Sequence, residues 1–110
     1  MPTVAVIGAS PDRTKFGNKA VRAYASRGYH VYPVHPKEKE IEGFKAYSSV
    51  EQIPESKLDV VAFYVPPSVG LKVIDQVAAK EVGELWLNPG TESPAILERA
   101  EALGLNAIAA

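Results

Sequence analysis

The sequence predicts an α/β protein in which helices cover both faces of a five-stranded parallel sheet. Short, continuous, β-branched apolar segments alternate along the chain with longer segments whose apolar residues recur at helical spacing. Short connections join them, which favours parallel strands linked by right-handed helical crossovers. The 110 residues suffice for one domain but not for a second core, so residues 1–110 are expected to form a single domain.

The first elements follow the N-terminus directly. Residues 4–7 are apolar and β-branched, which is typical of a strand buried on both faces. Residues 17–27 have one apolar helical face, and Gly28 follows where a C-terminal cap belongs. Residues 29–34 form the second predicted strand, which prolines stop near its end.

The middle of the chain is less regular, and the pattern then returns. A charged loop over 37–40, a turn at 42–43 and a short helix over 49–53 are expected. The remaining strands are predicted at 58–65, 85–87 and 105–109. Helices over 68–80 and 93–103 separate them, and Ser93-Pro94 is a preferred helix start.

This alternation predicts a three-layer, doubly wound, Rossmann-like sheet with the strands, numbered along the chain, in the order 3-2-1-4-5. Such sheets bind ligands at the carboxyl ends of their strands, where the strand order reverses. That point is expected between the first and fourth strands. Function is therefore sought in the loops after residues 7, 34, 65 and 87.

The first loop, residues 8–17, has the composition of a phosphate-binding loop. Gly8 allows a tight turn, Ser10 offers a hydroxyl and Lys15 a cation, and Gly17 begins a helix whose free N–H groups favour an anion. Ser10 replaces the second glycine of the dinucleotide-binding fingerprint. The alternative is an ordinary turn with a solvated Lys15.

The end of the second strand carries no acidic residue. An NAD site places Asp or Glu there to accept hydrogen bonds from ribose, whereas here Lys37 and Lys39 follow His35. Cations at this tip favour a phosphorylated ribose, as in NADP or coenzyme A. The alternative is that Glu38 and Glu40 pair with the two lysines on a solvated loop.

The other two strand ends are apolar or small. Val65, Pro66 and Pro67 form a stiff wall against which an adenine or a pantetheine arm could pack, although Pro67 is equally explained as a helix start. Residues 88–90, Asn-Pro-Gly, lie at the expected switch point or cap a helix. No triad or carboxylate pair is recognisable, and two histidines without cysteine make no metal site. The sequence indicates a ligand-binding protein, with no catalytic residue and no metal ligand predicted.

Composition and charge further narrow the partners and the cellular location expected of the protein. A net charge of −1 gives no general attraction to nucleic acid or to anionic membranes. There is no cysteine, no basic N-terminal region with a cleavage site, and no apolar run of the ~20 residues that a membrane helix needs. A cytoplasmic protein without nucleic-acid or membrane partners is expected.

The ordered set of motifs resembles the small bacterial CoA-binding proteins, which are similar to the nucleotide-binding domain of the succinyl-CoA synthetase α subunit. The resemblance extends over nearly the whole chain and is carried by VAVIGAS at residues 4–10, KFG at 15–17, GYHVYPVHP at 28–36, IEG at 41–43 through Tyr47, IP at 53–54, and VPP at 65–67.

The resemblance implies a domain that binds coenzyme A across its strand ends. The residues expected to face the diphosphate are Gly8, Ser10, Lys15 and Gly17. Those expected around the adenosine and its 3′-phosphate are Val34, Pro36 and Lys37 or Lys39. Ala9, Phe16 and His35 are also expected to bind the cofactor. Val65, Pro66 and Pro67 would flank the nucleotide, and Asn88, Pro89 and Gly90 would lie near the pantetheine.

The function favoured by the sequence is a non-catalytic module of acyl-CoA metabolism that binds coenzyme A or acyl-CoA. A second copy of the chain or an acyl-CoA enzyme is its expected partner. One alternative is an NAD(P)-dependent enzyme or redox sensor of the same fold. Another is a protein-interaction domain with a vestigial nucleotide site.

Overall fold

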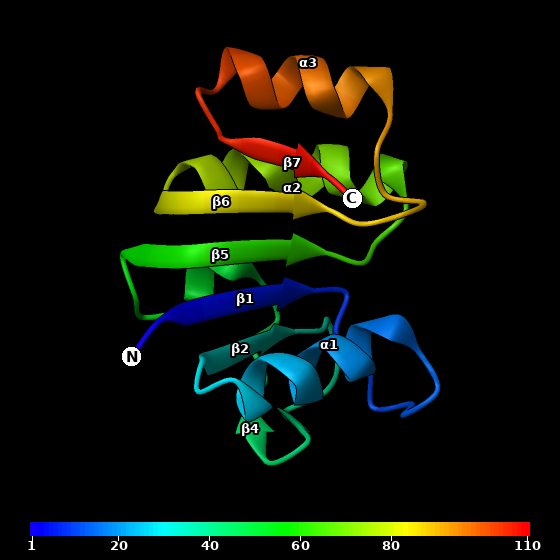
Figure 1. Cartoon of the computed structure of the whole chain (residues 1–110), viewed down its shortest axis with the longest axis vertical. Coiled ribbons are helices and arrows are strands. Elements are labelled where there is room, and N and C mark those ends of the chain that lie inside the picture. Colours follow the sequence, from blue (N-terminus) through cyan, green and yellow to red (C-terminus); the bar gives the residue numbers. More distant parts are fainter.

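Five strands form one parallel sheet in the computed structural model, which describes residues 1–110 (Figure 1). Their order across the sheet is β2-β1-β5-β6-β7. Each corresponds to one of the strands predicted from the sequence, and the strands are β1 (Thr3–Ile7), β2 (His30–Val34), β5 (Lys57–Phe63), β6 (Glu81–Leu87) and β7 (Ala107–Ala109). The predicted α/β class with a five-stranded parallel sheet is confirmed.

The predicted strand order of 3-2-1-4-5 is wrong. In the same numbering the order is 2-1-3-4-5, because β5 pairs with the inner edge of β1 and not with the outer edge of β2. Two features explain this. Five of the seven residues of β5 are apolar and buried, including the last four, which suits the centre of a sheet. The main chain of Tyr47 also forms a parallel bridge with Val34 and occupies the outer edge of β2.

The helices are divided unequally between the two faces. On one face α2 (Pro67–Ala78), α3 (Pro94–Ala102) and the short 3₁₀ helix η1 (Val50–Gln52) contribute to a core of 15 buried residues. On the other face α1 (Phe16–Ser26) packs over β1 and β2, within a second cluster of nine buried residues. No helix covers β5 and β6 on the α1 side, as Figure 1 shows.

A small hairpin absent from the sequence prediction lies between β2 and η1. It consists of β3 (Glu40–Ile41) and β4 (Phe44–Lys45), which pair in antiparallel fashion. The turn expected at residues 42–43 joins them, with φ of 51° at Glu42 and 82° at Gly43. Strand β6 begins at Glu81, four residues before its predicted start. The prediction missed this first half because exposed and half-buried positions alternate there, without the apolar run of the second half.

Parallel pairing places all the strand carboxyl ends at one edge of the sheet, called here the carboxyl edge. The strand order reverses there between β1 and β5, since β1 leads to β2 on one side and β2 leads back across β1 to β5. The switch point, which was predicted between the first and fourth strands, therefore lies between the first and third strands, β1 and β5. None of the helices has the length and apolar character needed to span a bilayer.

Candidate functional site: a cavity at the carboxyl edge

A cavity of ≈ 510 Å³ opens at the carboxyl edge, across the switch point between β1 and β5. Segments that follow four strands contribute to its wall. The lining residues are Gly8, Ala9, Ser10, Lys15, Phe16 and Gly17 after β1, His35 after β2, Tyr64, Val65 and Pro66 after β5, and Pro89, Gly90 and Thr91 after β6. This volume is in the range of about 300–1,000 Å³ usual for small-molecule sites.

Two glycines bring the start of α1 against the end of β1. Gly8 has φ of 92°, and a Cβ there would lie 2.7 Å from the carbonyl oxygen of Tyr64. A Cβ on Gly17 would overlap the carbonyl oxygen of Gly8. Both positions therefore require glycine, and the backbones of the first loop and α1 approach each other closely at one side of the cavity.

Side chains hold the first loop in shape between these glycines. The Ser10 Oγ accepts a hydrogen bond from the Asp12 N–H at 3.0 Å, and the Asp12 Oδ1 accepts from the N–H and hydroxyl of Thr14 at 2.9 and 2.7 Å. The bond from the Thr14 N–H is the main reason that the pKa of Asp12 is lowered from its ordinary 3.8. Asp12 is thus a structural carboxylate of the loop, and it does not line the cavity.

Two of the three α-helices begin at the cavity without a side-chain cap. Lys15 is the N-cap residue of α1 and Pro66 that of α2, and neither side chain accepts a hydrogen bond from its helix. In α3, by contrast, the Ser93 hydroxyl accepts from the N–H of Ile96 at 3.2 Å. In α1 the N–H groups of Phe16 and Gly17 are free, whereas in α2 only that of Ser68 is, since Pro67 has no N–H. Free N–H groups and the helix dipole attract anions, so both helix starts favour negative charge in the cavity.

His35 forms the part of the wall that follows β2. Its Nδ1 accepts hydrogen bonds from the backbone N–H groups of Lys37 and Glu38, each at 3.0 Å. Since Nδ1 accepts, the proton of the neutral imidazole is on Nε2, which is left to donate to a ligand. His35 thus stabilises the turn that carries Lys37 and also lines the cavity.

The charge of the lining is positive. Lys15 carries the only formal charge of the lining, because His35 accepts at Nδ1 as a neutral imidazole and none of the lining residues is Asp or Glu. Lys37 and Lys39 are exposed just beyond, and neither forms an ion pair, since the two ion pairs of the protein are Arg13–Glu42 and Arg99–Asp75. The alternative in which Glu38 and Glu40 pair with these lysines is not what the structure shows.

The segment after β6 is a type II turn. Pro89 and Gly90 are its central residues, Gly90 has φ of 89°, and the Thr91 N–H donates to the carbonyl of Asn88 at 2.9 Å. The Asn88 side chain donates to the carbonyl of Phe63 at 3.0 Å, which ties the turn to the end of β5. The turn is thereby fixed against the neighbouring strand.

A smaller cavity of ≈ 200 Å³ adjoins the first one. Its wall is formed by Phe16, Tyr64, Asn88 and Pro89, and all of these except Asn88 also line the larger cavity. The Phe16 side chain is 73% exposed, which is unusual for an aromatic residue of a small domain. Burial raises the pKa of Tyr64 above its ordinary 10.0, so its hydroxyl stays protonated as a donor.

The structure brings most of the predicted site residues together. Of the 17, it places eleven in the larger cavity and a twelfth, Asn88, in the smaller one. The five outside both are Val34, which is buried in the sheet, Pro36, Lys37 and Lys39, which are exposed beyond His35, and Pro67, which is in the first turn of α2. Tyr64 and Thr91 line the larger cavity and were not predicted; their positions directly beside the predicted Val65 and Gly90 were the available signal.

Comparison with known proteins identifies the family of the chain. Residues 2–110 match the family model described as the CoA binding domain. The chain is 37% identical over 94 residues to "Acetate--CoA ligase [ADP-forming] I" of Archaeoglobus fulgidus, and 42% identical over 64 residues to the α subunit of "Acetate--CoA ligase [ADP-forming] II" of Pyrococcus furiosus. These matches cover 84% and 57% of the chain but 14% of each relative, so the chain is much shorter than either.

Solved structures show the same relationship. A conserved hypothetical protein from Pyrococcus furiosus is 39% identical, with a TM-score of 0.90, and the match covers 99% of this chain and 93% of that one. The dinucleotide-forming acetyl-coenzyme A synthetase 1 of Ca. Korarchaeum cryptofilum is 29% identical, with a TM-score of 0.79 over 96% of this chain and 25% of its own. The family expected from the sequence motifs is confirmed: the chain belongs to the CoA binding domain family and is related to one domain of the ADP-forming acetate–CoA ligases.

Proposed function

We propose that this domain binds coenzyme A or an acyl-CoA in the cavity at the carboxyl edge and that it performs no chemistry of its own. The observation that carries the proposal is the combination of two uncapped helix N-termini with Lys15 and His35 around a cavity that has no acidic lining residue. This arrangement suits a ligand with several phosphates.

The ligand would lie across the strand ends. Its diphosphate would contact the first loop and the start of α1, where Ser10, Lys15 and Gly17 line the wall. Its 3′-phosphate would lie toward His35 and the unpaired Lys37 and Lys39. The pantetheine arm would extend toward the smaller cavity between Phe16 and Asn88.

Nicotinamide dinucleotides fit less well. NAD sites use a carboxylate at the tip of the second strand as acceptor for the ribose hydroxyls, and here His35 occupies that tip. The glycine spacing of the first loop also differs from the dinucleotide fingerprint, since Ser10 stands at the second glycine position. Both features support coenzyme A as the ligand.

The relatives indicate the scope of the function. The segments that match this chain make up 14% of each acetate–CoA ligase, so most of each ligase has no counterpart here. We infer that this domain supplies only ligand binding, as a carrier, sensor or regulatory subunit of acyl-CoA metabolism in the cytoplasm. Its proposed partner is an acyl-CoA enzyme or a second copy of the chain.

A ligand series tests the proposal. Thermal unfolding is measured with coenzyme A, dephospho-coenzyme A, NADP and NAD, because a ligand of the folded state raises the melting temperature according to its concentration relative to Kd. Coenzyme A should stabilise most, and removal of its 3′-phosphate should weaken the effect. A larger shift with NAD or NADP would favour the nicotinamide alternative, and no shift with any ligand would favour a protein-interaction domain.

A charge reversal tests the second loop separately. The K37E/K39E variant should lose most of its response to coenzyme A and little of its response to dephospho-coenzyme A, since only the 3′-phosphate would lie near these side chains. K72E is the matched control, because Lys72 is exposed on α2. An unchanged coenzyme A response in K37E/K39E would exclude the two lysines from the site.

A further inference from the structure

Glu42 has an unfavourable backbone conformation for its residue type. Its φ of 51° lies in the left-handed region, and it is the only non-glycine residue of the chain with a positive φ. Left-handed backbone is disfavoured wherever a Cβ is present, and such residues are often held in place for a functional reason. Gly43 follows with φ of 82°, so the turn between β3 and β4 contains two left-handed residues.

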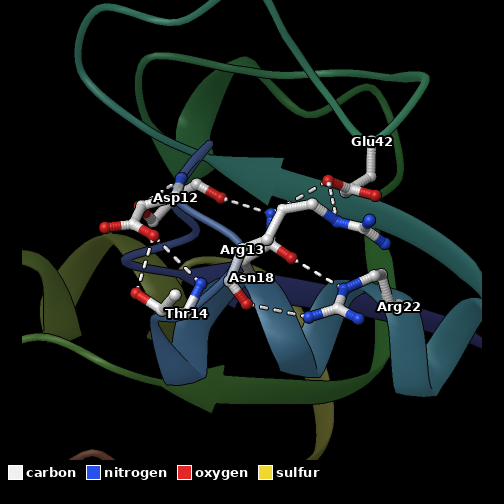
Figure 2. Close-up of polar contacts among 7 residues, drawn as sticks. Asp12, Arg13, Thr14, Asn18, Arg22 and Glu42 are labelled. Carbon is white, nitrogen blue, oxygen red and sulfur yellow. Dashed lines mark hydrogen bonds and ion pairs between the residues drawn. The ribbon is translucent and has the colours of Figure 1, made fainter.

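The Glu42 side chain reaches from this turn to the first loop and α1, as Figure 2 shows. Its Oε2 accepts a hydrogen bond from the Asn18 Nδ2 at 3.1 Å and forms an ion pair with the Arg13 Nε at 3.4 Å. The carboxylate is only 23% exposed, although the turn itself is on the surface. Glu42 thus joins two segments that are 24 residues apart along the chain.

Asn18 links Glu42 to the main chain of the first loop. It is fully buried, and its Nδ2 also donates to the carbonyl of Ser10 at 2.9 Å. Its Oδ1 accepts from the Arg22 Nε at 2.8 Å, and Arg22 in turn donates to the carbonyl of Arg13 at 2.9 Å (Figure 2). Two loop carbonyls, those of Ser10 and Arg13, are therefore held by a network that ends at Glu42.

The negative charge of Glu42 is unexpected beside the first loop. A carboxylate in contact with a loop proposed to bind phosphates repels them, so electrostatics alone predicts that removing it would strengthen anion binding. Its backbone conformation is also unfavourable. A role in shaping the loop explains why an acidic residue occupies a position where glycine or asparagine would be less strained.

We propose that Glu42 is a positioning residue for the first loop, and that the turn between β3 and β4 thereby controls how tightly the domain holds a phosphorylated ligand. The proposal deepens the coenzyme A function and rests on it. Glu42 does not line the cavity and touches no ligand; it acts through Asn18 and Arg13.

Three variants test the proposal. E42G removes the side chain and relieves the left-handed strain, so it should unfold within a few degrees of the unchanged protein. Its Kd for coenzyme A, measured by calorimetry, should rise about tenfold, the effect of about one charge-assisted hydrogen bond. E42Q keeps an oxygen that accepts from Asn18 and should stay within about threefold. E40Q removes a carboxylate from the same hairpin and should bind normally.

A second readout needs no ligand. Hydrogen exchange of the backbone amides of residues 9, 10 and 12–14 should be faster in unliganded E42G than in the unchanged protein and E40Q. Unchanged or tighter binding by E42G, or loop exchange at the original rate, would overturn the proposal. E42Q binding as weakly as E42G would refute the role of the Asn18 contact.

The experiments distinguish failure of the proposed function from failure of the positioning role of Glu42. If the unchanged protein does not bind coenzyme A, the proposed function is wrong, and the exchange rates alone decide whether Glu42 positions the loop. If it binds and all three variants bind equally, only the positioning role is wrong. Should E42G fail to fold, E42N replaces it, because asparagine tolerates left-handed backbone and its side chain is one methylene shorter.

Discussion

Replacing Gly17 with alanine probes the contact between the start of α1 and the end of β1. A Cβ at this position would overlap the carbonyl oxygen of Gly8. That oxygen belongs to the backbone at the end of a buried strand, and the Gly8 N–H donates to Val34 at 3.3 Å. Neither group can rotate away, so the helix must move outward.

The magnitude follows from two opposing effects. In a helix, alanine is favoured over glycine by about 0.5–1 kcal/mol. Overpacking against well-packed structure costs about 1–3 kcal/mol, and a rigid backbone neighbour puts Gly17 at the upper end of that range. We expect G17A to lower the free energy of unfolding by about 2 kcal/mol, which for a domain of this size lowers the melting temperature by roughly 10 °C.

Two other glycines serve as controls. At Gly70, in α2, a Cβ would meet the Ile96 Cδ1 at 2.8 Å, which is the end of a flexible side chain, so G70A should change stability by less than about 1 kcal/mol. At Gly28, with φ of 85°, nothing lies within 4 Å, so G28A should cost about 1–2 kcal/mol of backbone strain alone.

The assay is urea unfolding of the three variants, followed by thermal shifts with coenzyme A. G17A should also lose most of its ligand response, since an outward movement of α1 displaces the free N–H groups at its start. G28A should keep its full response, because Gly28 follows α1 at the opposite end. A G17A protein as stable as G70A, with an unchanged ligand response, would refute the reasoning.

Further predictions concern pH and helix capping. The hydrogen bond from the Thr3 N–H, at 2.8 Å, lowers the pKa of Asp59 in the folded state from its ordinary 3.8. The ionised carboxylate therefore stabilises the fold above pH 3.8, and this stability is lost as the pH falls toward the lowered pKa. D59N should show a shallower loss in urea unfolding between about pH 5 and pH 3. Burial, aided by the bond to Glu55, raises the pKa of Tyr32 to about 12, so its neutral form is favoured and stability falls as the pH rises above 10.0. Y32F should lack this alkaline loss and be about 0.5–1.5 kcal/mol less stable at neutral pH. P66S, which offers a capping hydroxyl at the start of α2, should raise the melting temperature without ligand and reduce the shift with coenzyme A. An equal or larger shift in P66S would show that α2 does not contact the ligand.

The elements of the fold were predictable because their signals are local. The β-branched run before Gly8 and the capping pair Ser93-Pro94 each specify an element within a few residues. Strand order is not local. The predicted order was wrong because the true order depends on two contacts between distant segments. The long strand β5 pairs with β1, and Tyr47 pairs with Val34 at the outer edge of β2.

The cavity brings most of the proposed site residues together for a simple reason: these residues directly follow strands, and parallel strands end at one edge. What the sequence could not show is how the segments between elements fold back. The contact between Glu42 and Asn18 joins a charged turn to a buried amide across 24 residues, and no spacing rule indicates it. Likewise, the exposed positions of Lys37 and Lys39 depend on how His35 caps its own turn.

The outer margins of the sheet limit how this protein can associate with others. On β2, Pro33 has no N–H, and its carbonyl and the N–H of His35 are already bonded to Tyr47, each at 2.9 Å. At the opposite margin β7 has only three residues. Neither margin offers a long ladder of unpaired groups for strand addition, which is how exposed sheets recruit further chains and aggregate. Any companion subunit is therefore expected to dock through side chains, leaving the sheet at five strands.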